Sequence, residues 1–472
     1  MKKTKIVATM GPASTESKEI LKEMIIHGTN VCRLNFSHGK HENHLNTINM
    51  VRDINSELDV DVALLADLQG PKIRIGDVEN NAAELIEGAQ LIISTEPCTG
   101  TKERVYLTYK EFPKDVAVGD RVLMDDGKLQ LEVTATNGKD EVTTRVINGG
   151  ILSSKKGVNL PNTKISLPCL TVKDLRDLDF ALDHNVDWIG LSFVRSAKDI
   201  EDLRKLITKK QKHTKIIAKI EKPEAVEDID AIIQTTDAIM IARGDMGVEL
   251  PAEKVPGIQK MIIRKARRYG KPTIVATQMM ESMIHNFSPT RAEVNDVANA
   301  VLDGADAVML SGETSVGKYP VEVIKTMTRI VKEIESHDEI YHKEELPERS
   351  EDRFISDSIC FNATRLAQRV EATAIITMTF SGYTAYKISS QRPKSDIYVF
   401  TENRRILTQL NLVWGVKGYF YDKIGTTDQT ILDCQLFLKA KDLVKTGDYV
   451  INVASVPVEE KGKSNMVKLS QI

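Results

Sequence analysis

Short apolar runs alternate with stretches of helical periodicity over most of the first 340 residues. A run of five to eight mainly apolar residues indicates a buried strand, and apolar residues spaced three and four apart indicate a helix with one buried face. The eight predicted strands are KIVATMG (5–11), NVCRLNF (30–36), VALLADLQ (62–69), VDWIGLSF (186–193), KIIAKIE (215–221), AIMIARGD (238–245), PTIVATQM (272–279) and AVMLSGE (307–313). Eight strand–helix units predict an α/β fold of the (β/α)8 TIM-barrel type, with an open doubly wound sheet as the weaker alternative.

The spacing of polar and apolar residues changes after DLQGPKIR (67–74), for about 95 residues. Segments such as RVYLTY (104–109) alternate polar and apolar residues with period two, and Asp126-Gly127 and Asn137-Gly138 favour tight hairpin turns. We therefore predict that residues 70–168 form an inserted small antiparallel β-barrel domain, between barrel segments 1–69 and 169–345. A domain that emerges from a strand–helix loop lies over the ends of the barrel strands, where it can act as a lid.

A third series of strands and helices follows the charged stretch 336–352. The predicted strands are AIITMT (374–379), DIYVFT (396–401), VKGYFY (416–421), DYVINVAS (448–455) and MVKLSQI (466–472), and one helix is expected to begin near Gly382. This order predicts a C-terminal α/β domain with a mainly parallel sheet over 346–472.

Composition narrows the class of protein. The chain of 472 residues is 41% hydrophobic and 28% charged with a net charge of −3, which gives no sign of a nucleic-acid or membrane partner. No apolar run of about 18 residues occurs that could cross a membrane. The five cysteines are widely spaced, which argues against a disulfide framework and predicts a cytoplasmic location.

Polar side chains gather where the predicted barrel strands end, and those ends carry the chemistry of such barrels. In chain order they are Arg33, Asn35, Ser37 and His38, then Asp67, Ser192, Lys219 and Glu221, Arg243 and Asp245, Thr277 and Gln278, and Ser311 and Glu313. Almost every strand contributes polarity to one rim, which predicts an active site there.

Lys219 and Glu221 lie two residues apart on one strand and therefore face the same side. They could be an internal ion pair, and Asp245 could be a helix N-cap. Together, however, Glu221 and Asp245 form an acidic pair that suits Mg2+, or Mn2+ in its place. Gly244 opens a loop whose backbone amides could approach a phosphate.

Positive charges at the same rim include Arg33 and Arg74, and no GxxxxGK[ST] loop is present. A divalent metal with several cations, and without a Ser-His-Asp or Cys-His arrangement, predicts phosphoryl transfer or enolate stabilisation.

The chain also resembles the pyruvate kinase family along its whole length. The motifs that carry the resemblance are TKIVATMGPAS, RLNFSHG, DLQGPKIRIG, KKGVNLP, KIEKPEA, ARGDMGVE, ATQMMESM and PTRAEVNDVANAVLDGADAVMLSGETSVGKYP. The resemblance implies a phosphotransferase that moves the phosphoryl group of phosphoenolpyruvate to ADP, through a Mg2+-stabilised enolate that is then protonated to pyruvate, in the last step of glycolysis. It also implies a homotetramer.

The resemblance assigns roles to individual residues. Glu221 and Asp245 would ligate Mg2+, Lys219 and Arg33 would contact the transferring phosphoryl group, and Thr277, with Ser311 through water, would protonate the enolate. The substrate-binding residues would be Arg33, Lys219, Gly244, Asp245 and Thr277. The nucleotide-binding residues would be Asn35, His38, Arg74 and Lys156, to which Asp125 or Asp126 of the lid could add a contact.

The family pattern also concerns a monovalent cation. Members that require K+ ligate it at positions matching Asn35, Ser37 and Asp67, and carry glutamate where this chain has Lys72. Lys72 is typical of potassium-independent members, because its ammonium group can supply the charge of the missing ion. We therefore expect a requirement for Mg2+ but not for K+. The alternative is that Lys72 is a solvated lysine after a turn.

The C-terminal domain resembles the effector domain of the family. Thr379, Ser381, Gly382 and Thr384 lie in the loop TMTFSGYTA, which is expected to bind a sugar phosphate or nucleotide, or else only to cap the following helix. Glu459 and Glu460 stand where members that respond to fructose 1,6-bisphosphate often carry an arginine or a glycine-rich turn, which argues against activation by that bisphosphate.

Two other functions compete with the kinase. A metal-dependent aldolase or lyase on a similar barrel would use the same enolate chemistry but has no need of Lys156 or a nucleotide clamp. A catalytically silent binding protein would be expected to have lost at least one of Lys219, Glu221, Asp245 and Thr277, and all four are present.

Overall fold

The computed structural model describes residues 2–161, 163–343, 345–349, 352–423, 425–456 and 464–472. Eight parallel strands close into a barrel in the order β1-β16-β15-β14-β13-β12-β3-β2. Their bounds are β1 Lys5–Thr9, β2 Val31–Asn35, β3 Ala63–Asp67, β12 Trp188–Leu191, β13 Lys215–Ile220, β14 Ala238–Ala242, β15 Thr273–Ala276 and β16 Ala307–Leu310. All eight predicted strands are present, so the barrel is confirmed and the open sheet is excluded.

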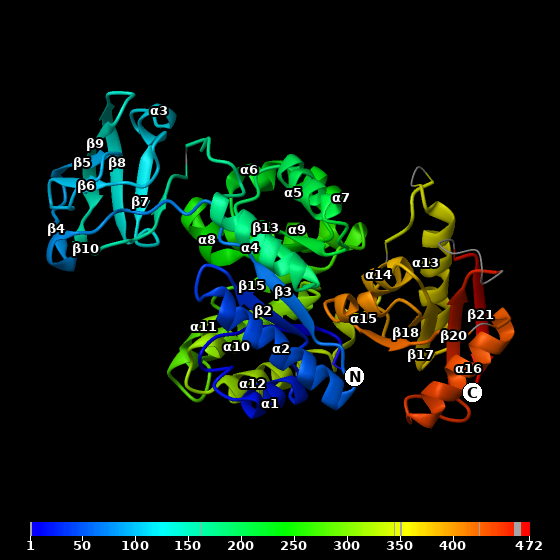
Figure 1. Ribbon diagram of the computed structural model, residues 1–472. Coiled ribbons are helices and arrows are strands. Elements are labelled where there is room, and N and C mark those ends of the chain that lie inside the picture. Colours follow the sequence, from blue (N-terminus) through cyan, green and yellow to red (C-terminus); the bar gives the residue numbers. More distant parts are fainter. Residues whose placement is uncertain (1, 162, 344, 350–351, 424, 457–463) are drawn as a thin grey trace.

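Helices cover the outside of the barrel, as the amphipathic pattern predicts (Figure 1). The longer ones are α1 Lys18–Ile26, α2 His41–Leu58, α4 Val172–Asp183, α5 Ala197–Lys209, α9 Val255–Arg268, α10 Arg291–Leu302 and α12 Pro320–Ile334. The shorter ones are α6 Pro223–Glu227, α7 Ile229–Thr235, α8 Arg243–Glu249 and α11 Gly312–Ser315. Thr171 and Thr290 begin α4 and α10 with reciprocal side-chain caps, which explains where these helices start.

The barrel has an inner and an outer core. Side chains that include Val7, Trp188 and Met240 fill the inside of the strands, and a larger apolar cluster packs the strands against the helices. The packed interior fixes the backbone of each strand, so the polar residues that follow the strands begin from rigid positions.

The inserted segment forms a curled sheet of six strands in the order β11-β7-β8-β9-β5-β6, beside a short pair β10-β4. The strands are β4 Ala83–Leu85, β5 Gln90–Ser94, β6 Arg104–Tyr106, β7 Arg121–Met124, β8 Leu129–Thr136, β9 Glu141–Asn148, β10 Gly150–Leu152 and β11 Val158–Asn159, with helix α3 Phe112–Asp115. Both predicted hairpins are confirmed, since β8 pairs with β7 and with β9 in antiparallel fashion. Only the β5–β6 pair of this sheet is parallel.

The C-terminal domain has a sheet in the order β19-β18-β17-β20-β21, parallel except for its last strand. The strands are β17 Ala374–Met378, β18 Asp396–Thr401, β19 Val416–Phe420, β20 Tyr449–Ala454 and β21 Met466–Gln471, and the helices are α13 Phe354–Arg369, α14 Tyr383–Ser390, α15 Arg404–Leu410 and α16 Thr427–Ala440. Gly382, at a φ of 84°, precedes α14 as predicted. Helix α13 was not among the predicted elements.

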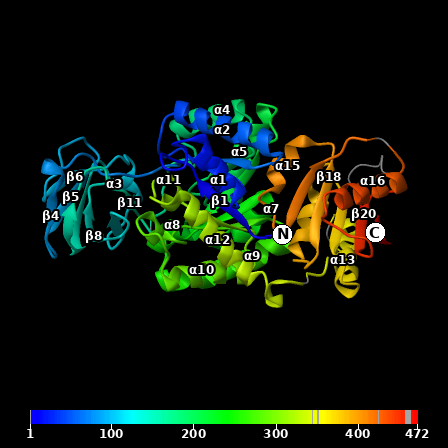
Figure 2. The ribbon, with the colours of Figure 1, turned by 90° about the horizontal axis from the view of Figure 1, so that it is seen from below.

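Figure 1 shows the inserted domain and the C-terminal domain on opposite sides of the barrel, and Figure 2 shows the same arrangement from below. The N-terminus lies beside the C-terminal domain, where Lys3 forms an ion pair with Asp396. All five cysteines are free. Within the described ranges, no helix combines the length and the apolar character needed to cross a bilayer.

Candidate active site

Four charged side chains meet at the C-terminal rim of the barrel, on strands β2 and β3 and at the end of β13. The Lys219 Nζ lies 2.9 Å from Glu221 Oε1 and 3.2 Å from Asp67 Oδ1. Arg33 contacts the other oxygen of Asp67, with its Nη2 at 2.6 Å and its Nε at 2.7 Å. The side chains of Asp67 and Glu221 are each 1% exposed, so these charges are compensated by one another and not by solvent.

Electrostatics ties Asp245 to the same cluster. Although burial opposes it, the fields of Asp67, Glu221 and Asp245 hold the pKa of Lys219 above its usual value. Burial opposes the shift of Asp67 too, yet Lys219 and Arg33 lower its pKa. For Glu221, burial and the nearby Asp245 raise the pKa against the effect of Lys219. Three carboxylates against two cations leave a net negative charge, which a cation would neutralise.

The rim residues fit a hard divalent metal. Glu221 and Asp245 offer carboxylate oxygens from two neighbouring elements, and Mg2+ commonly takes one or two protein carboxylates while substrate and water complete its shell. Among the described residues there is no group of three or more potential metal-ligating side chains, so a bound metal would depend on substrate oxygens.

Lys219 is oriented by a hydroxyl as well as by carboxylates. Its Nζ donates to Ser192 Oγ at 2.7 Å, and Ser192 in turn donates to the carbonyl of Leu68 at 2.6 Å. Glu221 is held from its other side by the backbone amide of Phe193, at 2.9 Å. Both charged groups therefore have fixed positions before any substrate binds.

Thr277 lies at the end of β15 in a strained backbone conformation. Its φ is 69°, and that of Gln278 is 54°, a region that a β-branched residue rarely adopts. The Thr277 hydroxyl accepts from the amide of Gly244 at 2.7 Å and donates to the carbonyl of Ala276 at 2.6 Å. This conformation brings the hydroxyl to the backbone of Gly244, the residue before Asp245.

Gly244 and Asp245 belong to a helix and not to the strand end and loop that the sequence predicted. Strand β14 ends at Ala242, and helix α8 begins at the next residue, Arg243, without an intervening loop. Ala242 is the N-cap, so Asp245 lies in the first turn and does not cap the helix. The Gly244 amide is already bonded to Thr277, so it is not a free anion donor.

Several cationic residues lie near His38. Burial and then the fields of Lys72, Arg74 and Arg33 lower the pKa of His38, which places these groups close together. Asn35 and Ser37 form a local turn, in which the Ser37 amide donates to Asn35 Oδ1 at 3.1 Å.

A cleft of about 310 Å3 lies between the lid and the barrel. It brings together Lys72, Arg74 and Lys156 with Asp245, and it also includes Asp125 and Asp126. Lys156 Nζ lies 2.7 Å from Asp125 Oδ1. Both residues, which were predicted to contact the nucleotide, line this cleft. The two lid aspartates have φ values of 50° and 56° in the β7–β8 turn.

A contact between lid and barrel was not foreseen from the sequence. Asn159 of β11 donates to Glu249 Oε1 at 2.8 Å, and Lys222 donates to the same oxygen at 2.7 Å. Lys222 follows Glu221 directly, so the lid is connected to the segment that carries the metal-ligand candidate. Neither Lys222, in KIEKPEA, nor Glu249, in GVELPAE, carries a sequence signal for this contact.

Other rim residues are turned elsewhere. Arg243 forms two hydrogen bonds with Asp296, both at 2.7 Å, which commits it to the protein. Glu313 accepts from the amides of Ser311 and Met280 at 2.6 and 3.1 Å, so it supports the loop. Between described residues, no hydrogen bond joins the hydroxyls of Ser311 and Thr277, and a link between them would need water.

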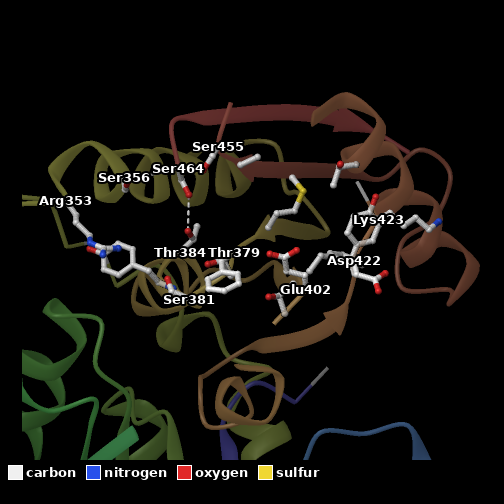
Figure 3. Close-up of a pocket in the computed structure, with 18 residues that line it drawn as sticks. Arg353, Ser356, Thr379, Ser381, Thr384, Glu402, Asp422, Lys423, Ser455 and Ser464 are labelled. Carbon is white, nitrogen blue, oxygen red and sulfur yellow. Dashed lines mark hydrogen bonds between the residues drawn. The ribbon is translucent and has the colours of Figure 1, made fainter. Parts of the chain in front are cut away.

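The C-terminal domain contains a second cavity, of about 390 Å3, which Figure 3 shows. Thr379, Ser381 and Thr384 line one part of it, and Glu402, Asp422 and Lys423 lie at the other end. The hydroxyls of Thr379 and Ser381 accept from the amides of Gly382 and Tyr383, and Thr384 Oγ1 lies 3.0 Å from Ser464 Oγ. Glu459 and Glu460 lie outside the described residues.

Comparison with known proteins agrees with this architecture. The model of the family "Pyruvate kinase, barrel domain" matches residues 1–324, and that of "Pyruvate kinase, alpha/beta domain" matches residues 357–470. Pyruvate kinase from Geobacillus stearothermophilus is 44% identical over 476 residues, which cover 100% of this chain and 80% of that protein. The enzyme from Corynebacterium glutamicum is also 44% identical, over 99% of this chain and 97% of its own. A crystal structure of a pyruvate kinase from Cryptosporidium parvum superposes with a TM-score of 0.91 at 36% identity, covering 100% of this chain and 96% of that chain. The chain belongs to the pyruvate kinase family.

Proposed function

We propose that the barrel rim is where this chain transfers the phosphoryl group of phosphoenolpyruvate to ADP, giving pyruvate and ATP. The observation that supports this most strongly is the buried cluster of Arg33, Asp67, Lys219 and Glu221, with Asp245 beside it. Its cations are held by carboxylates on rigid strands, which is the preorganisation that phosphoryl transfer requires.

In the transfer step, the bond between phosphorus and the enol oxygen breaks while a terminal oxygen of ADP takes the phosphoryl group. Arg33 and Lys219 would lie against the equatorial oxygens and balance the charge that develops there. Lys219 would also stabilise the enolate oxygen that remains. Thr277 would orient the water that protonates the enolate carbon, with Ser311 as a second member of that relay.

Glu221 and Asp245 would hold Mg2+, or Mn2+ in its place. When bound, the ion supplies Lewis-acid stabilisation to the phosphoryl and enolate oxygens. The protein's own contribution is to keep both carboxylates within reach of a substrate that Lys219 and Arg33 orient.

The lid would supply the nucleotide contacts. Asn35, His38, Arg74 and Lys156 are the proposed ADP-binding residues, and the cleft between lid and barrel has room for the phosphates. Lys156 would exchange Asp125 for phosphate oxygens when the lid closes, which would also exclude water.

We also propose that K+ is not required, because the ammonium group of Lys72 takes the place of that ion. Its influence on His38 supports a position beside Arg33. Asn35, Ser37 and Asp67 would then not ligate a monovalent ion, and Asp67 already contacts both Arg33 and Lys219.

Apolar clusters that lie within each segment support the domain boundaries that we propose: 1–69 with 169–345, 70–168, and 346–472. We further propose a cytoplasmic homotetramer, in which the cavity around Thr379, Ser381, Gly382 and Thr384 binds a sugar-phosphate or nucleotide effector. No nucleic-acid or membrane partner is expected.

A coupled assay of pyruvate formation tests the proposal. We expect turnover only when phosphoenolpyruvate, ADP and Mg2+ are all present. Pyruvate release without ADP would instead indicate that water takes the phosphoryl group, as in a phosphatase, and the absence of turnover in the complete mixture would favour the lyase or the binding protein.

A further inference from the structure

Another cavity, of about 270 Å3, lies between the barrel and the C-terminal domain. It lies at the start of β13, and the active site lies at the opposite end of that strand. Lys215, the first residue of β13, and Lys271, just before β15, line it from the barrel. Arg353 and Lys387 line it from the C-terminal domain. Figure 3 shows Arg353 and Ser381, which this cavity shares with the larger one, on the side away from Glu402 and Asp422.

The charges around the cavity do not balance. Asp237 pairs with Arg204, at 3.0 Å, and Asp357 pairs with Lys387, at 2.9 Å. Asp357 also accepts from the Tyr383 hydroxyl at 2.6 Å. Lys215, Lys271 and Arg353 remain, and none of them forms an ion pair with a residue in the described part of the chain.

Two of these three cations are buried and held by contacts other than an ion pair. Although burial opposes the shift, Tyr386 and Asp237 raise the pKa of Lys215. The Lys215 Nζ lies 4.6 Å from the centre of the Tyr386 ring, and Lys271 donates to the carbonyl of Thr236 at 2.5 Å. Burial lowers the pKa of Lys271, and repulsion from Lys215 adds to this shift, although the field of Asp237 opposes it. The Tyr386 hydroxyl is buried without a hydrogen-bond partner among the described residues. Buried polar groups and charges of this kind normally have partners.

We propose that this interdomain cavity binds a small phosphate monoester, with its phosphoryl group between Lys215, Lys271 and Arg353. Three unmatched positive charges suit a dianion better than a carboxylate, and lysine and arginine are the usual partners of phosphate. The volume lies just below that of typical pockets for drug-sized ligands, about 300 Å3, which suits a small ester.

The site has a structural consequence for the barrel. A bound anion would remove the repulsion between cations of two domains and would hold the first residue of the strand that carries Lys219. The inference stands on the charges and the cavity and does not depend on the reaction assigned to the rim.

Titration calorimetry with glycerol 3-phosphate, and with inorganic phosphate for comparison, tests the site. The double variant Lys215→Gln/Lys271→Gln should bind the ester at least about tenfold more weakly, because two charged contacts are lost. It should fold normally, because it removes repulsion. Lys156→Gln alters only the active-site cleft and Thr384→Val only the larger C-terminal cavity, so both should leave this binding event unchanged.

Undiminished binding in the double variant, or no binding to the wild-type chain, would overturn the site. Loss of binding in Lys156→Gln or Thr384→Val alone would also overturn it, because the ester would then occupy one of the other cavities. Equal affinity for inorganic phosphate would overturn the assignment of an ester and identify free phosphate as the ligand.

Discussion

The barrel rim and the C-terminal cavity differ in how their polar groups are held. At the rim, Lys219 contacts two carboxylates whose side chains are 1% exposed, all on or just after packed strands. In the C-terminal cavity, polar groups come from loops as well as from helices, and Lys423 approaches Asp433 only to 3.7 Å with 71% of its side chain exposed. The charged groups at the rim are therefore fixed by one another, whereas the C-terminal cavity also contains an exposed cation that is held only weakly.

The largest effect should come from the rim. In Glu221→Gln we expect turnover to fall by about 1,000-fold, because a metal ligand and the partner of Lys219 are lost together. The Mg2+ concentration for half-maximal activity should also rise. Glu227→Gln, an exposed neighbour in α6, is the matched control. Unchanged dependence on Mg2+ would contradict the role of Glu221.

Thr277 separates proton transfer from phosphoryl transfer. In Thr277→Val we expect overall turnover to fall by about 100-fold, the usual size of an acid–base contribution. ATP formation in a single turnover should be affected less than protonation of the enolate, which can be followed by solvent deuterium incorporation. Thr277→Ser keeps the hydroxyl and should recover most activity. A loss in Thr277→Ser as large as that in Thr277→Val would contradict the assignment of the effect to the hydroxyl.

Lys72 tests the monovalent-cation argument. The wild-type chain should work equally well in K+ and in tetramethylammonium, whereas Lys72→Glu should lose about tenfold in tetramethylammonium and regain it in K+. A wild-type enzyme that needs K+ would contradict the proposal and leave Lys72 as a solvated lysine.

The connection between lid and barrel should have a smaller effect. Asn159→Ala removes the lid's hydrogen bond to Glu249, and we expect the KM for ADP to rise about threefold while kcat changes little. Lys139→Ala, at an exposed turn of the same domain, is the control. A fall in kcat with unchanged KM would assign Asn159 to the chemical step instead.

A prediction of a different kind concerns stability at the base of the barrel. Burial raises the pKa of Asp187 to about 6, although hydrogen bonds from Thr408 and Leu64 oppose the shift. The folded state thus retains a proton that the unfolded state has lost, so this group contributes up to about 3 kcal/mol at pH 4, and the contribution disappears as the pH rises through 6. In urea unfolding, wild-type stability relative to Asp187→Asn should be higher at pH 4.5 than at pH 7. A constant difference would contradict the raised pKa.

Much of the rim could be predicted from the sequence because parallel strands bring their ends to one face. Knowing that Lys219, Glu221 and Asp67 lie at the ends of strands of one barrel was enough to expect them at the same rim, although β12 separates β3 from β13. The ion-pair partners of these charged side chains were not predictable. Asp67 pairs with both Arg33 and Lys219, whereas Arg243 pairs with Asp296 on α10. These choices depend on side-chain directions that the spacing of residues does not determine.

Helix α13 and the contact between Asn159 and Glu249 escaped prediction for other reasons. The helix carries polar residues such as Asp357 on its buried side, which weakens the periodic signal. The lid contact joins residues that are 90 positions apart, on elements whose relative placement only the folded chain reveals.

The most direct test of the central claim compares two lysines on the same strand in the coupled pyruvate assay with Mg2+. Lys219→Met should lose nearly all activity, by a factor of about 1,000 or more, because it removes a charge at the transferring phosphoryl group. Lys215→Met, at the opposite end of β13, should retain turnover within about threefold, since it contacts no reacting atom. Comparable activity in both variants would contradict the assignment of phosphoryl transfer to the barrel rim.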